Sequence, residues 1–340
     1  MAKRPLGIAV VGCGSTAHRR HLPVWRGMDD ARLVAVVSRD AARREAARQE
    51  FGAEMALEDW RQLAAIPEVE AVDICTPHPT HAEIACALAT AGKHVLCEKP
   101  MATTLEDARR MAEAARRAGV VLMPFHNMRL LGASRAAVAC LREGVVGQPH
   151  LVRGVMAHGG PDARDPRRKW FLEAAAGGGV VLDLGPHLFD LTRVLLGQPA
   201  VRVRASTLTP AGWTVERDAL VEIVFADESR AQLALSWSLV GGRETQITVQ
   251  GSAGHLRLTL VQDPPGNPGH PPVPLTLVQA GEGTEIRHPT PAATEDPCAL
   301  FVRAVRDGVR SLEAEDGVAS LALVDGVYRS ADGGGVWVDL

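Results

Sequence analysis

Residues 6–17 read LGIAVVGCGSTA, and this stretch decides the fold of the N-terminal half. Leu6–Val11 is a short apolar run typical of a buried strand, and the glycines that follow break it before a helical segment. The pattern G-x-G-x-x-A between a strand and a helix is the fingerprint of a dinucleotide site, where a pyrophosphate approaches the helix N-terminus. We therefore predict that a dinucleotide binds at the turn residues Gly12, Gly14, Ser15, Thr16 and Ala17.

Further strand-and-helix units follow this first one. Short apolar runs predict strands over residues 33–37, 72–75, 94–97 and 120–123, and helical patterns cover residues 40–51, 81–91 and 105–118. Alternation of this kind predicts a Rossmann domain, a doubly wound parallel α/β sheet, over residues 1–124. Because ligands bind at the carboxyl ends of the strands in such sheets, the turns at those ends are the candidate site.

The turn after the second strand decides which dinucleotide is expected. An NAD-binding domain usually carries an acidic residue there for the ribose hydroxyls, whereas this chain has Ser38 and Arg39. An arginine can pair with the 2′-phosphate of NADP, and no carboxylate at position 38 would repel that phosphate. We therefore expect NADP rather than NAD, bound by Ser38 and Arg39. The alternative is that Arg39 is merely solvated and that Asp40 caps the next helix.

The segments after the third and fourth strands carry residues that we expect to line the cofactor site, namely Thr76, Pro77, His78, His81, Glu98 and Lys99. Pro100 restricts the preceding Lys99 to an extended conformation, which would hold an ammonium group at the edge of the sheet. A lysine at a strand end commonly just faces solvent. The glutamate before it and the proline after it favour a functional role instead.

Residues 177–197, GGGVVLDLGPHLFDLTRVLLG, predict a buried helix from Val180 onward, because they are apolar nearly all round. Asp183, His187 and Asp190 nevertheless lie at i, i+4 and i+7 and share one face. Pro186 is expected to bend the helix there. One interpretation is a satisfied core cluster with a capping aspartate. The triple glycine before the helix, which admits a ligand, favours an active-site face.

With these motifs the chain resembles the Gfo/Idh/MocA family of nicotinamide-dependent oxidoreductases, which act mostly on sugars, inositols and related polyols. The resemblance runs from Leu6 to the C-terminus and depends on residues 12–17, on residues 76–102 (TPHPTHAEIACALATAGKHVLCEKPMA) and on residues 177–190. It implies that Lys99 of the E-K-P motif forms a catalytic group with Asp183 and His187 of the D-x-G-x-H motif. Lys99 comes from the first domain and the other two from the second, so the group implies a cleft shared by both domains.

The resemblance is incomplete at two positions. His78 stands where the family often has asparagine, so its contact near the nicotinamide is left open. Arg129-Leu130 stands where the family usually has Arg-Phe, which leaves the role of Arg129 open as well.

The implied chemistry is a hydride transfer between a carbinol carbon and the nicotinamide. His187 would take the hydroxyl proton, Lys99 would hold the oxygen, and Asp183 would orient the substrate or His187. Tyrosine-based reduction is disfavoured because the only tyrosine, Tyr328, has no lysine four residues on. Two alternatives stay open: an NAD-using glycosidase of the same family, and a non-catalytic sugar- or dinucleotide-sensing regulator. A regulator need not keep all three residues, which disfavours it.

The C-terminal half changes character near Phe125, where the strand-and-helix alternation stops. A linking helix is predicted over residues 134–143, strands over 150–157, 201–207, 219–225, 230–237, 245–250, 255–260 and 336–340, and closing helices over 295–307 and 317–330. We expect an α+β domain over residues 125–340, with a predominantly antiparallel open sheet and covering helices, of which those over 295–330 have the option of packing back on the first domain. The resemblance implies a homodimer or homotetramer through the open sheet face. Residues 263–274 (DPPGNPGHPPVP) read as a loop rather than a site.

Residues 158–170, HGGPDARDPRRKW, are the segment expected to set substrate identity, between the sheet and the buried helix. We expect His158 and Trp170 to bind substrate together with the catalytic group. Three cations in the segment, Arg167, Arg168 and Lys169, are typical of a solvated surface but would also suit an anionic group.

Composition excludes several classes of function. The length of 340 residues with 46% hydrophobic residues suggests two domains with large cores. The net charge of −3 provides no basic field for nucleic acid or an anionic membrane, and no apolar run approaches the ~18 residues of a membrane span. The six cysteines are scattered without a C-x-x-C pair, which argues against a metal site and for a reducing, cytoplasmic setting.

Overall fold

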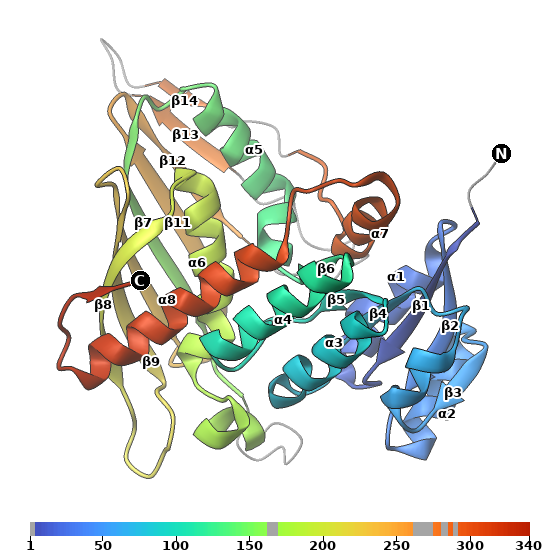
Figure 1. Ribbon diagram of the computed structural model, residues 1–340. Helices are drawn as coiled ribbons and strands as arrows, with labels where there is room; N and C mark the ends of the chain where they lie inside the picture. The colour runs from blue at the N-terminus through green and yellow to red at the C-terminus, as the bar shows by residue number, and fades with distance from the viewer. Residues whose placement is uncertain (1–3, 162–168, 261–274, 280–284, 288–291) are drawn as a thin grey trace. The chain divides into compact units, whose positions relative to one another are not determined.

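The computed structural model describes residues 4–161, 169–260, 275–279, 285–287 and 292–340 (Figure 1). The chain divides into two compact units, the first made of Met1–His126 and Asp296–Val318 and the second of Asn127–Glu295 and Ala319–Leu340. The first unit therefore contains a segment from the far end of the chain. The predicted loop over residues 263–274 lies outside the described residues, as do Arg167 and Arg168.

The first unit is built on a six-stranded parallel sheet in the order β3-β2-β1-β4-β5-β6. Its strands are β1 (Leu6–Val11), β2 (Ala31–Val37), β3 (Met55–Leu57), β4 (Ala71–Ile74), β5 (His94–Cys97) and β6 (Leu122–Pro124). The central strands β1 and β4 are buried along their whole length because both faces of the sheet are covered. The direction of winding reverses between β1 and β4, where doubly wound sheets bind their ligands. The predicted Rossmann architecture is thus confirmed.

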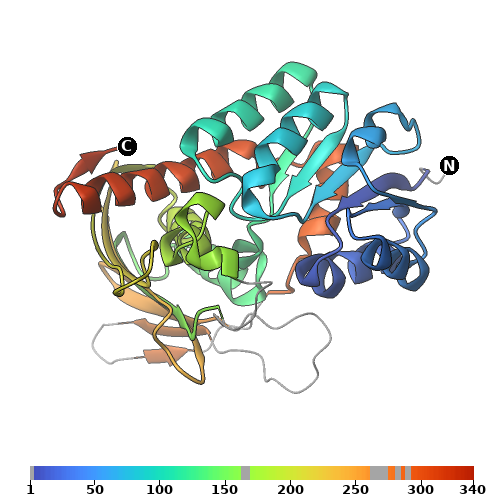
Figure 2. The same ribbon diagram turned by 90° about the horizontal axis from the view of Figure 1, so that it is seen from below.

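Helices cover both faces of this sheet (Figure 2). On one side lie the π-helical segment η1 (Ala17–His21), its continuation α1 (Leu22–Gly27), and α2 (Ala41–Phe51). On the other lie α3 (His81–Thr90) and α4 (Leu105–Ala118), and α7 (Pro297–Asp307) contacts β5. Side chains cap the starts of α2, α4 and α7, and left-handed glycines end these three helices. Thr104, for example, caps α4 by accepting from the Asp107 N–H at 3.1 Å, and Gly119 closes it.

The second unit is built on a nine-stranded sheet in the order β14-β13-β12-β11-β7-β10-β9-β8-β15. All neighbouring strands pair antiparallel except β7 and β10, which are parallel. The strands are β7 (Pro149–His158), β8 (Ala200–Leu208), β9 (Asp218–Phe225), β10 (Arg230–Ser236), β11 (Arg243–Gly251), β12 (Gly254–Thr259), β13 (Leu275–Gln279), β14 (Glu285–Arg287) and β15 (Val338–Asp339). The predicted open, mostly antiparallel sheet is confirmed, and β13 and β14 extend it beyond the predicted strands.

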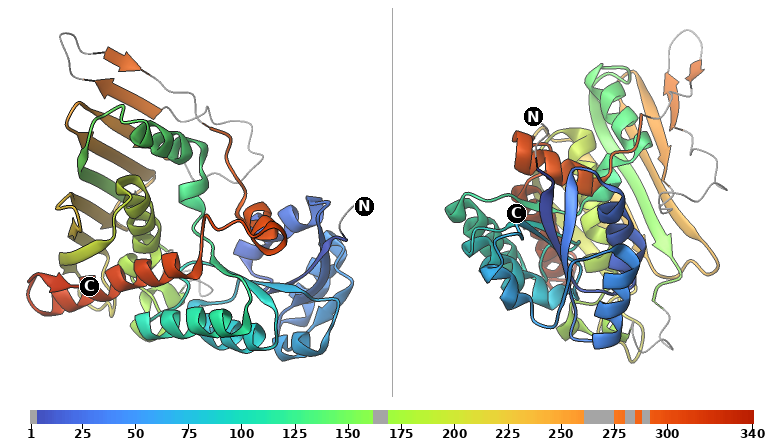
Figure 3. Two further views of the ribbon diagram at one scale, coloured as in Figure 1. Left: turned by 45° about the horizontal axis from the view of Figure 1, so that its top comes forward. Right: turned by 90° about the vertical axis from the view of Figure 1, so that its right-hand side faces the viewer.

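Helices α5 (Gly132–Arg142) and α6 (Val180–Leu196) lie on the same face of this sheet (Figure 3). The predicted helix from Val180 is confirmed as α6, which packs on β7, β9 and β10 and continues through Pro186. It lies close to β7 because Gly154 has no side chain, and a Cβ there would be 3.2 Å from a methyl group of Leu188. The last helix, α8 (Ala314–Asp332), begins in the first unit and ends in the second. Among the described residues, no helix combines the length and apolarity that a membrane crossing requires.

Candidate active site

The turn after β1 has the geometry that a dinucleotide needs. Gly12 adopts a φ of +101°, and a Cβ there would lie 2.8 Å from the backbone that follows β4, so only glycine fits. At Gly14 a Cβ would meet nothing within 4 Å, so the backbone borders open space. Ser15 and Thr16 are exposed in the first helical turn, while Ala17 is fully buried where the helix meets the sheet. The residues therefore fit a pyrophosphate at the helix N-terminus.

The loops that follow β4 and β5 are tied together by His81. Its Nε2 lies 2.8 Å from the Thr76 carbonyl oxygen and its Nδ1 lies 3.0 Å from the Pro100 carbonyl oxygen. Burial lowers the pKa of His81, and the neutral ring donates to one of these two oxygens. The ring is fully buried, so it supports the two loops rather than reaching outward. Pro77 and His78 begin the short helix η3 (His78–Thr80), and the His78 ring centroid lies 5.8 Å from that of His81.

The turn after β2 shows the cap on α2 and the exposed arginine that the alternative interpretation predicted. Asp40 caps α2 by accepting from the Arg43 N–H at 3.1 Å, and its carboxylate pairs with the Arg43 guanidinium at 3.2 Å. Arg44 donates to the backbone oxygens of Ser38 at 3.2 Å and of Arg39 at 3.3 Å. Arg39 itself is exposed. The cap on α2 therefore leaves the Arg39 side chain accessible to a ligand.

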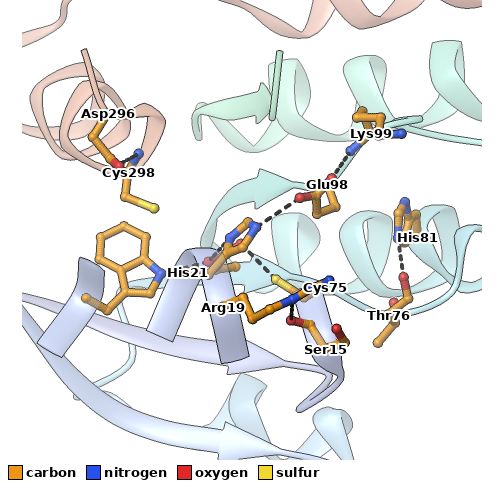
Figure 4. A network of polar contacts seen from close by, with 12 residues as sticks. Ser15, Arg19, His21, Cys75, Thr76, His81, Glu98, Lys99, Asp296 and Cys298 are labelled. Carbon is orange, nitrogen blue, oxygen red and sulfur yellow. Dashed lines mark hydrogen bonds and ion pairs between the residues drawn. The ribbon is translucent and has the colours of Figure 1, made fainter. Parts of the chain in front are cut away.

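The carboxylate of Glu98, directly after β5, is held at both oxygens (Figure 4). Oε2 accepts from the backbone N–H of Lys99 at 2.9 Å, and Oε1 lies 3.0 Å from Nε2 of His21. The other ring nitrogen of His21, Nδ1, lies 2.8 Å from Oδ2 of Asp73 in β4. His21 and Asp73 were not among the predicted site residues. The one sequence signal was an aspartate inside the otherwise apolar run AVDI of residues 71–74.

The start of α6 is capped from a distant part of the second unit. Gly179 precedes the helix with a φ of +108°, and a Cβ there would lie 2.5 Å from a carboxylate oxygen of Glu216. That residue accepts from the Val180 N–H through its backbone oxygen at 3.1 Å and from the Val181 N–H through Oε1 at 2.8 Å. The Tyr328 hydroxyl donates to the same Oε1 at 3.2 Å. The predicted alternative of a capping aspartate is therefore wrong, because Glu216 performs that role.

Asp183, in the first turn of α6, faces two groups from the sheet. Its Oδ2 accepts from the indole N–H of Trp237 at 3.3 Å and lies 3.7 Å from Nε2 of His158. His158 Nδ1 accepts from the Gly160 N–H at 2.9 Å, which places the proton of a neutral ring on Nε2, toward the carboxylate. The structure thus brings together the predicted residues Asp183 and His158, and it adds Trp237, for which the sequence carried no signal.

An aromatic row extends from this carboxylate. Trp170 stacks on Phe171 with ring centroids 3.8 Å apart, and Phe171 meets Trp237 edge to face at 6.5 Å. The His158 ring lies 6.5 Å from the same indole. Both predicted substrate residues of the segment over 158–170 therefore belong to one cluster around Asp183.

The remaining polar residues of α6 differ from one another. His187 is buried, with 4% of its surface exposed. Asp190 forms a buried bidentate ion pair with Arg129: the arginine Nε donates to Oδ2 at 2.8 Å and its Nη2 donates to Oδ1. Asp190 is therefore a satisfied core carboxylate, as the alternative interpretation of this helix face predicted, and Arg129 neutralises its charge. The pair also gives Arg129 a structural role in linking η4 (Asn127–Leu130) to α6.

Comparisons with known proteins cover both units. Residues 6–126 match the model of an oxidoreductase family with an NAD-binding Rossmann fold, and residues 134–257 match that of the GFO/IDH/MocA C-terminal domain. The chain is 32% identical to the D-apiose dehydrogenase of Paraburkholderia graminis over 264 residues, which is 74% of this chain and 67% of that protein. It is 30% identical to the myo-inositol 2-dehydrogenase of Thermotoga maritima, over 73% of this chain and 74% of that protein.

A solved structure extends the likeness to nearly the whole chain. GenD2 from gentamicin A biosynthesis, in complex with NAD, is 30% identical and superposes with a TM-score of 0.83 over 99% of this chain and 97% of that one. The glycine turn, the Rossmann sheet and the open sheet thus agree with the sequence matches. The chain belongs to the Gfo/Idh/MocA family of NAD-binding oxidoreductases.

Proposed function

We propose that this oxidoreductase transfers a hydride between a nicotinamide and a secondary alcohol or ketone of a sugar, an inositol or a related polyol. Family membership supports the class of reaction, and the relatives named above act on D-apiose and myo-inositol. The observation that carries the substrate class is the cluster around Asp183. A carboxylate accepts hydrogen bonds from hydroxyl groups, and the neighbouring aromatic faces suit the C–H faces of a polyol.

The proposed roles follow the chemistry of each side chain. A bound nicotinamide supplies the acceptor or donor of the hydride. In the direction of oxidation, His187 takes the hydroxyl proton as general base, and Lys99 holds the oxygen and stabilises its developing negative charge. Asp183, fixed by Trp237 and His158, orients the substrate hydroxyls. Reduction runs the same proton transfer in reverse, from His187 to the oxygen.

We propose NADP as the preferred cofactor. The support is the exposed guanidinium of Arg39 and the absence of a carboxylate at position 38, since Asp40 is engaged with Arg43. All six cysteines lie in the described part of the chain as free thiols, which supports a reducing, cytoplasmic setting. We further propose a homodimer or homotetramer through the open sheet face, supported by the exposed apolar side chain of Leu220 on β9.

The decisive experiment starts with a panel of polyols and aldoses, assayed with NAD and with NADP. On the best substrate, His187→Ala should lower kcat by roughly 10²–10⁴-fold while cofactor affinity is kept, with partial recovery at high pH where solvent takes the proton. Lys99→Ala should raise KM as well as lower kcat, because its ammonium contacts the oxygen in the ground state and the transition state. Near-wild-type turnover of His187→Ala would reject His187 as the general base, and a wild-type protein that binds cofactor but turns over no member of the panel would favour a non-catalytic protein.

A further inference from the structure

A buried chain of polar groups lies beneath the strand ends of the first unit (Figure 4). His21, the last residue of η1, sits between Asp73 Oδ2 at 2.8 Å and Glu98 Oε1 at 3.0 Å. His21 and Asp73 have no exposed surface, and Glu98 has 7%. The second oxygen of Glu98 accepts from the backbone N–H of Lys99. The contacts therefore lead from β4 to the lysine at the end of β5.

The geometry of these buried polar groups indicates how many protons the His21 ring carries. Both ring nitrogens of His21 face carboxylate oxygens, and an ionised carboxylate only accepts hydrogen bonds. Two hydrogen bonds to ionised carboxylates thus require a doubly protonated ring. Burial opposes that charge but is outweighed, first by the charge of Asp73, then by Cys75 and the hydrogen bonds to both side chains, which place the pKa of His21 well above its ordinary value. Burial is likewise outweighed at Glu98, where the hydrogen bond and charge of His21, then the charge of Lys99, lower the pKa to about 2.

The other neighbours of His21 do not change the assignment of two protons to its ring. Trp25 donates its indole N–H to the same Asp73 oxygen at 2.7 Å, and the Phe125 ring lies 4.3 Å from the His21 ring. Burial raises the pKa of the nearby Cys75 and Cys298 thiols. Among the described residues, donor atoms of His21, Asp73 and Cys298 also lie within 4.8 Å of one another, as metal ligands would. The hydrogen bond from His21 to Asp73 already satisfies two of those three groups.

We infer that His21 is a positioning residue for Lys99 and acts through Glu98. Its donated hydrogen bond holds Oε1, so Glu98 presents Oε2 in one direction and fixes the backbone at which the lysine side chain begins. Asp73 and Trp25 in turn hold the ring from its other side. Misplacement of a catalytic group by about 1 Å costs on the order of 10²-fold in rate, so such support has a kinetic effect. The inference rests on the proposed function, because it requires Lys99 to act on substrate.

The protonation state is tested by ¹⁵N NMR of histidine-labelled protein, with His21 assigned by its loss from the His21→Leu spectrum. Both ring nitrogens should report attached protons and should not titrate from about pH 6 to about pH 9. His94 serves as the internal control, because burial lowers its pKa and its Nδ1 accepts from the Val121 N–H at 3.0 Å. An unprotonated nitrogen on His21 at neutral pH would overturn the inference.

The positioning role is tested by a double-mutant cycle of His21→Leu and Lys99→Ala. In the wild-type background His21→Leu should lower kcat by roughly 10–100-fold with cofactor affinity kept. In the Lys99→Ala background the same change should have almost no further effect, because the lysine it positions is gone. His94→Asn, which keeps an acceptor for the Val121 N–H, is the matched control and should leave kcat unchanged.

The outcomes separate the inference from the proposed function. If His21→Leu lowered kcat equally in both backgrounds, its role would be merely structural. That result would reject the positioning of Lys99 but would leave the proposed function standing. Wild-type turnover of Lys99→Ala would reject the proposed function and the positioning role with it. If His21→Leu does not fold, His21→Gln, which keeps one donor group, replaces it in the cycle and should show the same dependence on Lys99 with a smaller loss.

Discussion

At Gly14 a side chain would extend into open space beside the first helical turn after β1. Gly14→Val should therefore fold normally and weaken cofactor binding by at least about tenfold, or 1.4 kcal/mol, because the valine occupies the volume a pyrophosphate needs. Titration of NAD(P)H fluorescence measures the loss. Gly27→Val is the matched control, since a Cβ there also meets nothing within 4 Å. Equal affinity of Gly14→Val and wild type would move the dinucleotide site elsewhere.

The proposed preference for NADP depends on Arg39. Arg39→Ala should reduce the affinity for NADP about tenfold or more and leave the affinity for NAD nearly unchanged, because only NADP carries the 2′-phosphate. Competitive binding of the two cofactors to both proteins provides the ratio. Arg43→Ala is a useful companion, as that guanidinium is already paired with Asp40. A wild-type protein that prefers NAD tenfold would contradict the proposed preference.

Single residues could be predicted where local patterns determine them. Gly12 and Gly14 follow from the spacing of one turn, and Asp183 and His187 from a motif within one helix. Contacts with partners from distant parts of the chain could not be predicted in this way. The helical period places Asp190 on the face of His187, but its partner Arg129 lies 61 positions away. The contact of His21 with Glu98 was not predicted for the same reason: the two residues are far apart in the sequence, and only the fold brings them together.

Among the elements, α6 depends on a cap supplied from outside the helix. Glu216→Ala would leave the Val181 N–H without its side-chain acceptor, and we expect the free energy of unfolding to fall by about 1–3 kcal/mol. Glu216→Gln keeps an oxygen in that place and should lose less. Chemical denaturation of both variants gives the difference. Equal stability of Glu216→Ala and wild type would mean that α6 does not need this cap.

Glu216 also makes the stability of the folded protein depend on pH. Burial raises the pKa of Glu216 in the folded protein, so folding favours its protonated form. Its contribution to stability is fully present below the unfolded pKa of about 4.3 and is lost as pH rises through the raised folded value. Glu216→Gln should remove this component. Thermal unfolding of both proteins across the acidic range would reveal it, and parallel Tm profiles would contradict the assignment.

Whole elements were predicted best where they were long. The strands β9 and β10 can be recognised in the sequence because apolar, buried residues alternate with more exposed ones along much of each strand. Helix α6 can be recognised because its residues form a long run that is apolar nearly all round. β3 was missed because its three residues are all half-buried and show no alternation. The predicted last strand over residues 336–340 is present as β15, although only two of those residues, Val338 and Asp339, pair with β8.

For the molecule as a whole, the open face of the second sheet determines the proposed assembly. Leu220 is 64% exposed on the face of β9 turned away from α6. Leu220→Glu should place a charge in the interface and reduce the mass in solution toward that of one chain, as light scattering would measure. Val240→Glu is the control, because Val240 is 92% exposed in the turn between β10 and β11. An unchanged mass for Leu220→Glu would exclude this face.

The return of residues 296–318 to the first unit has a consequence for biosynthesis. Phe301 and Cys298 of α7 have no exposed surface, so the first unit buries side chains that the ribosome makes only after nearly all of the second. The sheet of the first unit therefore stays incompletely covered near β5 until α7 has been made. Some 170 further residues are synthesised first, at roughly 5–20 residues per second. During those seconds the growing chain is a natural client for chaperones, and the unit whose synthesis began first is completed only after most of the second unit has been made.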